Sequence, residues 1–77
     1  MMHQQTNSTV SPREIQVLHL LSNGYSSKEI AHQLYVSTYT VNDHRKSLLQ
    51  KLEVRNVAQM VRKGFELELL NIRNNKL

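Results

Sequence analysis

The chain has 77 residues, no cysteine and a formal net charge of +4 at neutral pH. A chain of this length forms one domain at most, and its core is small unless helices pack tightly or two copies share a surface. The lack of cysteine excludes disulfides and thiolate metal sites, no histidine pair has the helical spacing of metal ligands, and no apolar run approaches the roughly 18 residues of a membrane-spanning helix. We therefore expect a cytoplasmic domain that uses no metal, cofactor, small-molecule ligand or membrane.

Two segments open the chain. Residues 1–9 are polar and aperiodic, which predicts a flexible arm or the remnant of a linker. A first helix is predicted over about residues 12–22, because Ser11 is a good N-cap, Pro12 suits the first helical position and Glu14 completes a capping box.

The second and third helices begin with the same kind of signal. Ser26 with Glu29 predicts a helix over about residues 27–34, and Ser37 predicts a longer one over residues 38–52. At each of the three serine caps, Ser11, Ser26 and Ser37, an apolar residue stands just before the cap and another stands four positions after the cap, as in a hydrophobic staple. This shared register turns the third helix so that Val41 faces inward.

A fourth helix is predicted over residues 57–70, with Asn56 as its N-cap and Gln59 at the capping-box position. Its apolar surface is broader than a small domain easily buries. Residues 73–77 are a polar tail. The four helices predict an all-α fold, a four-helix bundle that contains a helix-turn-helix, in one domain over residues 10–72. The sequence leaves four residues of the fourth helix open between core and dimer interface: Val57, Met60, Val61 and Phe65.

The short helix, tight turn and longer helix over residues 26–52 have the outline of a helix-turn-helix, whose second helix can enter the major groove of DNA. With Val41 inward, a rotation of about 100° per residue places a polar face outward. The expected base-reading residues on that face are Asn42, Asp43, Lys46 and Gln50. Asn can pair with adenine, Lys with guanine and Asp with the cytosine amino group. Asp43 has a second interpretation, because a carboxylate near a helix start stabilises the helix dipole.

The net charge of the whole chain lies in residues 37–63, which carry six basic and two acidic residues. Such a field attracts polyanions, although a solvated helix face would give the same pattern. Helix N-termini and neighbouring cations are the expected phosphate contacts: Ser26, Ser27, Lys28, Thr38, Tyr39, Thr40, His44, Arg45, Lys51 and Arg55. His44 has a second interpretation as a half-buried ring inside the motif, and Tyr25 and Tyr35 are interpreted as core residues.

Several short motifs follow one another through the chain. They are Ser11-Pro12-Arg13-Glu14, Gly24-Tyr25-Ser26-Ser27-Lys28-Glu29-Ile30-Ala31, Val36-Ser37, Thr40-Val41, His44 and Lys51-Leu52-Glu53-Val54. In order and spacing they closely resemble the LuxR-type DNA-binding domain of bacterial transcriptional regulators, over about residues 10–70. The resemblance implies a domain that binds double-stranded DNA as a homodimer, commonly through its fourth helix, with Asn42, Asp43 and Lys46 at the main base-facing positions. Domains of this family are usually the output part of response regulators and quorum sensors, and some stand alone.

One position departs from the family pattern. Glu53 follows the third helix where the family generally has Gly, and a left-handed conformation costs a non-glycine residue roughly 1 kcal/mol. Either this turn is strained or the helix ends by another route, and the geometry of a dimer depends on which.

Two other function classes were compared with DNA binding. A protein-interaction module would contact RNA polymerase or another regulator through the apolar surface of the fourth helix. An enzyme is not expected, because the sequence has no nucleophile motif, metal-ligand cluster, paired-carboxylate pattern or Gly-rich phosphate loop that would supply catalytic residues.

Overall fold

The computed structural model describes residues 10–71, which form four helices and no β-strand. The helices are α2 (Pro12–Ser22), α3 (Ser27–Leu34), α4 (Thr38–Lys51) and α5 (Val57–Glu66). The all-α prediction is confirmed, and the first three predicted helices agree with the observed ones to within one residue at each end. The predicted arm over residues 1–9 and the predicted tail over residues 73–77 lie outside the described residues.

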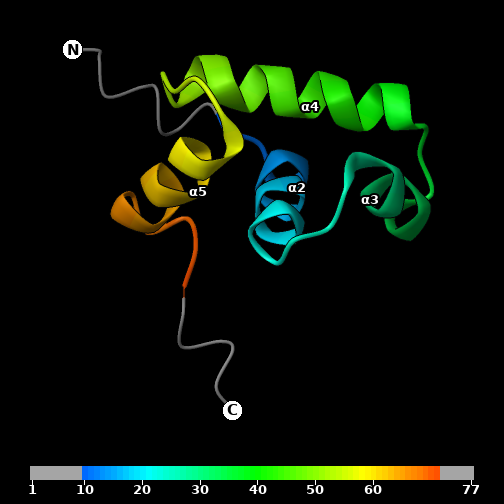
Figure 1. The fold of residues 1–77 in the computed structure, drawn as a ribbon, viewed down its shortest axis with the longest axis horizontal. Helices are drawn as coiled ribbons and strands as arrows, with labels where there is room; N and C mark the ends of the chain where they lie inside the picture. Colours follow the sequence, from blue (N-terminus) through cyan, green and yellow to red (C-terminus); the bar gives the residue numbers. More distant parts are fainter. Residues whose placement is uncertain (1–9, 72–77) are drawn as a thin grey trace.

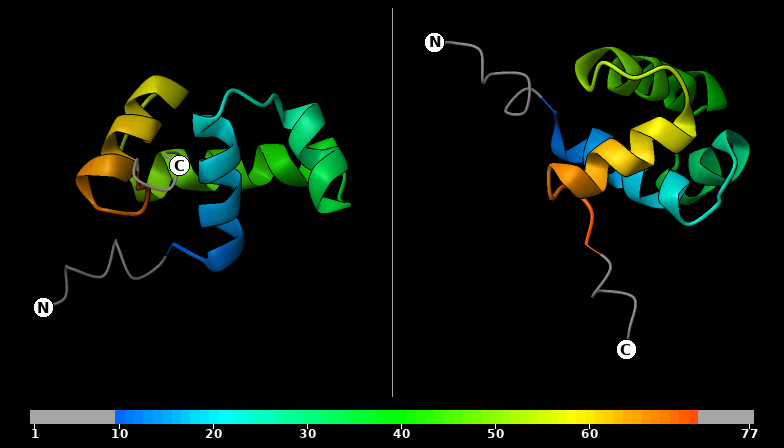
Figure 2. Two further views of the ribbon diagram at one scale, coloured as in Figure 1. Left: turned by 90° about the horizontal axis from the view of Figure 1, so that it is seen from below. Right: turned by 60° about the vertical axis from the view of Figure 1, so that its left-hand side comes forward.

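Helix α2 contacts each of the other three helices. The long helix α4 crosses the bundle and contacts α3, α2 and α5 (Figure 1). The further views show α3 and α5 on opposite sides of α2 (Figure 2). One face of α4 is therefore packed against the other helices, while the opposite face is left toward solvent.

The predicted N-caps are the observed ones. The side chains of Ser11 and Ser26 accept hydrogen bonds from the backbone N–H groups of Glu14 and Glu29 at 3.0 and 3.1 Å. In return, the two glutamate carboxylates accept the N–H groups of the capping serines at 2.9 and 2.8 Å. Two complete capping boxes therefore fix the starts of α2 and α3.

The start of α5 differs in one detail from the prediction. Asn56 caps the helix by accepting the N–H of Gln59 at 2.8 Å. The amide oxygen of Gln59, however, accepts the N–H of Arg55 at 2.9 Å and not that of Asn56. The Gln59 side chain thus bonds the backbone of Arg55, the residue before the cap.

Three helices end through a non-glycine residue in the left-handed conformation. Tyr35, Glu53 and Glu68 have φ angles of 59°, 58° and 63°. After α4, the N–H of Val54 donates back to the carbonyl of Leu49 at 3.0 Å, which is the bond that closes a Schellman turn. The strained alternative for the Glu53 turn is therefore the observed one.

We expect Glu53→Gly to raise the free energy of unfolding by about 1 kcal/mol, because glycine adopts this conformation without a Cβ clash. Glu53 is exposed, so little packing is lost. Urea denaturation at neutral pH measures the change. Glu66→Gly is the matched control, since Glu66 is exposed and helical, and there the same substitution should lower stability. A loss of stability in both variants would contradict the prediction.

The fourth helix is shorter than predicted, because it ends at Glu66 and not at residue 70. Leu70 instead folds back into the core, and its N–H donates to the carbonyl of Gly64 at 3.1 Å. A Cβ on Gly64 would lie 2.9 Å from Cδ1 of Leu70 and 3.0 Å from Cδ2 of Leu18, so the glycine allows this close approach. Burial of Leu70 thus ends α5 early, although the apolar residues continue at helical spacing beyond Glu66.

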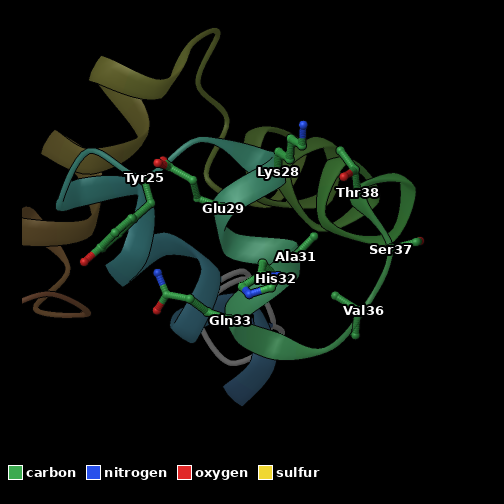
Figure 3. A pocket seen from close by; sticks show the side chains of 9 residues that line it. All are labelled: Tyr25, Lys28, Glu29, Ala31, His32, Gln33, Val36, Ser37 and Thr38. Atoms are coloured by element: carbon green, nitrogen blue, oxygen red, sulfur yellow. The ribbon is translucent and has the colours of Figure 1, made fainter.

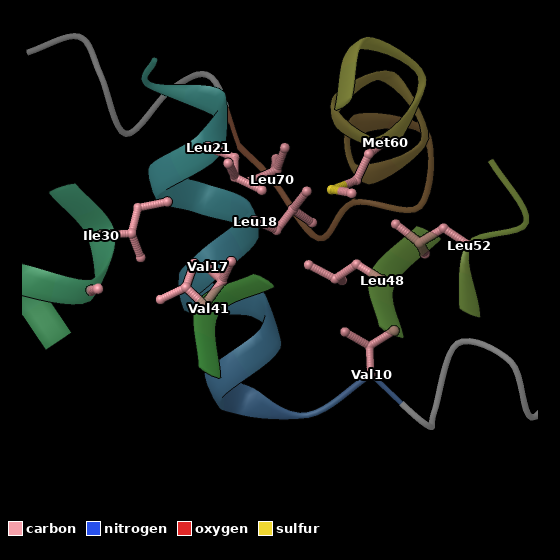
Figure 4. Close-up of a cluster of buried hydrophobic side chains, with 11 residues drawn as sticks. Val10, Val17, Leu18, Leu21, Ile30, Val41, Leu48, Leu52, Met60 and Leu70 are labelled. Atoms are coloured by element: carbon pink, nitrogen blue, oxygen red, sulfur yellow. The ribbon is translucent and has the colours of Figure 1, made fainter. Parts of the chain in front are cut away.

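The core is one cluster shared by all four helices (Figure 4). Its largest fully buried side chains are Val17, Leu18, Ile30, Val41, Leu48, Leu52 and Met60. Met60 has no exposed surface, so of the two alternatives that the sequence leaves open, core and dimer interface, it belongs to the core. Val57 and Val61 are only half-buried against the same cluster.

Candidate nucleic-acid interface

The outer face of α4 is a polar surface of the helix-turn-helix. Val41 and Leu48 are fully buried, which confirms the predicted inward orientation of Val41. The four predicted base-reading residues are all exposed: Asn42, Asp43, Lys46 and Gln50. They follow one another at helical spacing along the side of α4 that is turned away from the core.

A chain of hydrogen bonds joins this face to the first turn of α3. The guanidinium Nη1 of Arg45 donates to the hydroxyl oxygen of Ser27 at 2.6 Å. The same hydroxyl donates its proton to Oδ1 of Asn42 at 2.8 Å. Three residues predicted independently as DNA contacts are therefore linked to one another. This link could not be predicted from sequence, because Ser27 lies 15 residues before Asn42.

The other candidate phosphate contacts surround the N-termini of α3 and α4. Lys28, Thr38 and Tyr39 are exposed, and Tyr39 keeps 75% of its surface open. Thr40 is half-buried, with its hydroxyl 3.0 Å from that of Ser37. Ser26, as the N-cap of α3, and Arg55, before α5, are also exposed. His44 is half-buried in the flank of α4.

Tyr25 and Tyr35 are not core residues, so that interpretation is wrong. Tyr35 is 94% exposed in the turn between α3 and α4, and Tyr25 is 40% exposed before α3. Tyr25 lines an open groove along α3 that ends at the start of α4, together with Lys28, His32 and Thr38 (Figure 3). Tyr35 is the left-handed residue that ends α3.

The structure gives Lys51 a partner within the domain. Its ammonium group lies 2.9 Å from Oε1 and 3.2 Å from Oε2 of Glu14, which is only 6% exposed. Ser47, one helical turn earlier on α4, donates to Oε2 of Glu14 at 2.7 Å. Glu14 thus contacts α4 at two points, through Ser47 and through Lys51.

The ionisation of Glu14 depends on these contacts. Burial opposes the charged form and raises the pKa, but hydrogen bonds from the backbone of Ser11 and from the side chains of Lys51 and Ser47 outweigh it. The pKa of the Glu14 carboxyl is therefore lowered from its ordinary 4.5. The carboxylate is charged at neutral pH and fixes the rotation of α4 about its own axis.

The exposed edge of α5 carries the remaining dimer candidates. Val57 and Val61 are half-buried, and Phe65 is 36% exposed. At about 100° per residue these three side chains form one stripe along the helix, beside the buried positions of Met60 and Gly64. We call Val57, Val61 and Phe65 the α5 stripe.

Residues 10–71 contain neither a metal site nor a membrane-spanning helix. No group of three histidine, cysteine, aspartate or glutamate side chains there is placed to hold a metal ion. In the same range, no helix has the length and apolar character needed to cross a membrane.

A short helix, a tight left-handed turn and a longer helix with an exposed polar face, packed on a shared core, define a helix-turn-helix domain. A family model described as "Bacterial regulatory proteins, luxR family" matches residues 8–63. The chain therefore belongs to the LuxR family of bacterial transcription regulators with a DNA-binding domain.

Curated relatives agree with this assignment. The oxygen regulatory protein NreC of Staphylococcus carnosus (strain TM300) is 36% identical over 74 residues, with 88% of this chain and 34% of that protein covered. NreC of Staphylococcus haemolyticus (strain JCSC1435) is 34% identical over 62 residues, with 80% and 29% covered. The chain thus spans about a third of the length of these relatives.

Two solved structures share the fold. The transcription factor GerE has a TM-score of 0.76 and 34% identity, and the match covers 79% of this chain and 91% of GerE. The response regulator ChrA of a heme-sensing two-component system has a TM-score of 0.78 and 31% identity, with 80% of this chain and 31% of ChrA covered.

Proposed function

We propose that the domain is a sequence-specific transcriptional regulator that reads the major groove of double-stranded DNA with α4. The observation that carries the proposal is the outer face of α4, where four polar side chains are exposed opposite a fully buried apolar face. Asn42 and Lys46 offer donors and Asp43 offers acceptors, which are the groups that distinguish base edges in the major groove. Neither a metal nor a cofactor enters this mechanism.

Phosphate contacts position α4 in this proposal. The N-termini of α3 and α4 present backbone N–H groups and helix dipoles that favour anions. The residues assigned to phosphate are Ser26, Ser27, Lys28, Thr38, Tyr39, Thr40, His44, Arg45 and Arg55. Ser27 is assigned through its backbone N–H, because its hydroxyl proton is donated to Asn42. Lys51 is left out, because its ammonium group bonds Glu14. Neutralisation of phosphates releases counterions, so affinity should depend steeply on salt. Bacterial DNA is cytoplasmic, and we place the protein there.

Salt dependence tests the proposal directly. Binding to a duplex selected from a random pool is measured by fluorescence anisotropy between roughly 50 and 300 mM salt. In a plot of the logarithm of the association constant against the logarithm of the salt concentration, the slope should be about −0.9 for each phosphate neutralised. A flat response would exclude an electrostatic contact with the DNA backbone. Failure of the wild-type domain to select any common sequence would exclude specific readout.

We further propose that two copies dimerise on DNA through the α5 stripe. Its side chains are half-buried or partly exposed, and a second copy that covered them would extend a small core. A two-fold dimer predicts half-sites related by symmetry and about one helical turn apart, so the selected sequence should be palindromic. The same stripe suits the alternative proposal, in which it contacts RNA polymerase or another regulator.

Val61→Glu is expected to abolish dimerisation on DNA, because a carboxylate in the middle of an apolar interface is desolvated without a partner. Sedimentation of the protein with a duplex that carries two half-sites should change from two copies per duplex to one. Lys63→Glu is the control, since it places a carboxylate on the opposite edge of α5 and makes the net charge two units more negative, whereas Val61→Glu changes it by one unit. Two copies of Val61→Glu on the duplex would exclude the α5 stripe as the interface.

A further inference from the structure

The hydrogen bonds among Arg45, Ser27 and Asn42 have a direction that chemistry fixes. A guanidinium group can only donate, so the hydroxyl oxygen of Ser27 accepts from Arg45 at 2.6 Å. The hydroxyl has a single proton, and it is donated to Oδ1 of Asn42 at 2.8 Å. The amide oxygen of Asn42 is therefore held toward α3.

This direction determines what Asn42 offers to the solvent side of α4. Because Oδ1 of Asn42 is hydrogen-bonded to Ser27, the amide nitrogen is the end of the amide that faces outward. This nitrogen carries two N–H donors and no acceptor. An isolated asparagine has a broad terminal torsion and can present either end of its amide. Ser27 removes that freedom, and Arg45 in turn orients Ser27.

We propose that Ser27 is a positioning residue that makes Asn42 a reader of acceptor groups, with guanine preferred over adenine at one base pair. Guanine presents two acceptors in the major groove, N7 and O6, to the two amide donors. Adenine presents N7 beside its N6 amino group, which faces the amide nitrogen donor to donor. This inference rests on the proposed function and replaces the sequence-based expectation that Asn42 pairs with adenine.

The arrangement also links the two helices of the motif in function. Ser27 is the first residue of α3, whose N-terminus is assigned to phosphate, whereas Asn42 belongs to the reading face of α4. A change at Ser27 therefore alters which base is read without removing any group that touches the base. A purely structural role for Ser27 would change stability or overall affinity and leave the preference at single base pairs unchanged.

Selection from a random duplex pool tests the inference, with bound sequences counted for wild type, Asn42→Ala and Ser27→Ala. Asn42→Ala should lose its preference at one base pair in each half-site, and the wild type should favour guanine over adenine there. Ser27→Ala should reduce this guanine preference by about 3- to 10-fold, the effect of losing one orienting hydrogen bond, with the preferences at all other base pairs retained. Circular dichroism and the unfolding midpoint confirm that each variant is folded.

Two more variants keep the test decisive. Ser27→Thr retains the hydroxyl and should restore the guanine preference. Asn42→Asp keeps an oxygen for Ser27 but presents an acceptor outward, so the preference should change to cytosine, whose amino group donates. Ser22→Ala is the matched control, because the Ser22 hydroxyl bonds only its own helix, to the carbonyl of His19 at 2.6 Å.

Each outcome decides the question. Adenine as the wild-type preference, a full preference retained in Ser27→Ala, or no position altered by Asn42→Ala would each overturn the inference while leaving DNA binding intact. If the wild-type domain selects no sequence at all, the proposed function itself fails, and this result is distinct from the others.

Discussion

Glu14→Ala should lower the free energy of unfolding by about 3 kcal/mol, because it removes a buried carboxylate together with its ion pair to Lys51 and the hydrogen bonds that it accepts from Ser47 and Ser11. Glu14 is 6% exposed, and its carboxylate accepts from Lys51 at 2.9 Å and from Ser47 at 2.7 Å. The substitution also removes the bond to the N–H of Ser11 that caps α2. A domain of this size is stable by roughly 5 kcal/mol, so most of its stability depends on this one side chain. Urea denaturation at neutral pH measures the loss.

The control uses the second capping box of the molecule. Glu29 accepts the N–H of Ser26 at 2.8 Å, as Glu14 does with Ser11, but it is exposed. Glu29→Ala should therefore cost only about 1 kcal/mol, the value of a capping interaction at a helix start. Equal losses in the two variants would mean that the contacts of Glu14 with α4 contribute nothing.

The pH dependence of stability follows from the lowered pKa of Glu14. A carboxyl whose pKa is lower in the folded state than its ordinary 4.5 stabilises the fold above that value, where it is charged in both states. The stabilisation is lost as the pH falls through the folded pKa. The difference in stability between wild type and Glu14→Gln should therefore be constant near neutral pH and shrink below about pH 4.5. A difference that grows toward acid pH would contradict the assignment.

The starts of the helices could be predicted from sequence because each depends on local chemistry. Ser11, Ser26, Ser37 and Asn56 all cap the helices that follow them, through bonds to residues three positions on. The orientation of α4 followed from the same local signals, since the register of its cap turned Val41 inward. A cap and an inward residue are enough to determine which side chains face solvent on a helix.

Sequence alone could not predict the features that depend on distant residues. Lys51 lies on the flank of α4 that sequence assigned to DNA, and its partner Glu14 is 37 residues away. Burial of Leu70 against Gly64 ends α5 early, although the apolar spacing continues. The exposure of Tyr35 depends on a left-handed turn that a tyrosine does not predict. An i, i+4 pair of Ser47 and Lys51 on one flank was the only available sign of an inward polar contact.

Lys46→Glu should weaken binding to the selected duplex by roughly 100-fold or more at about 0.15 M salt. Removal of a well-aligned base contact costs about 1 to 3 kcal/mol, and a carboxylate placed near phosphates adds repulsion. Lys46 is exposed on the outer face of α4 and its substitution leaves the core unchanged, so the unfolding midpoint should stay close to that of the wild type. Fluorescence anisotropy measures the affinity.

Lys63→Glu on α5 changes the net charge of the domain by the same amount as Lys46→Glu. It therefore separates a local contact of Lys46 with DNA from the general attraction of a basic domain for DNA. A loss of affinity in Lys46→Glu that far exceeds the loss in Lys63→Glu places the DNA on α4. Similar losses would indicate that overall charge alone attracts DNA, and unchanged binding in Lys46→Glu would favour the interaction-module alternative.

Lys46→Met distinguishes a base contact from a phosphate contact. If Lys46 reads a base, this variant relaxes the preference at one base pair and retains the salt dependence, whereas loss of a phosphate contact lowers the slope by about one.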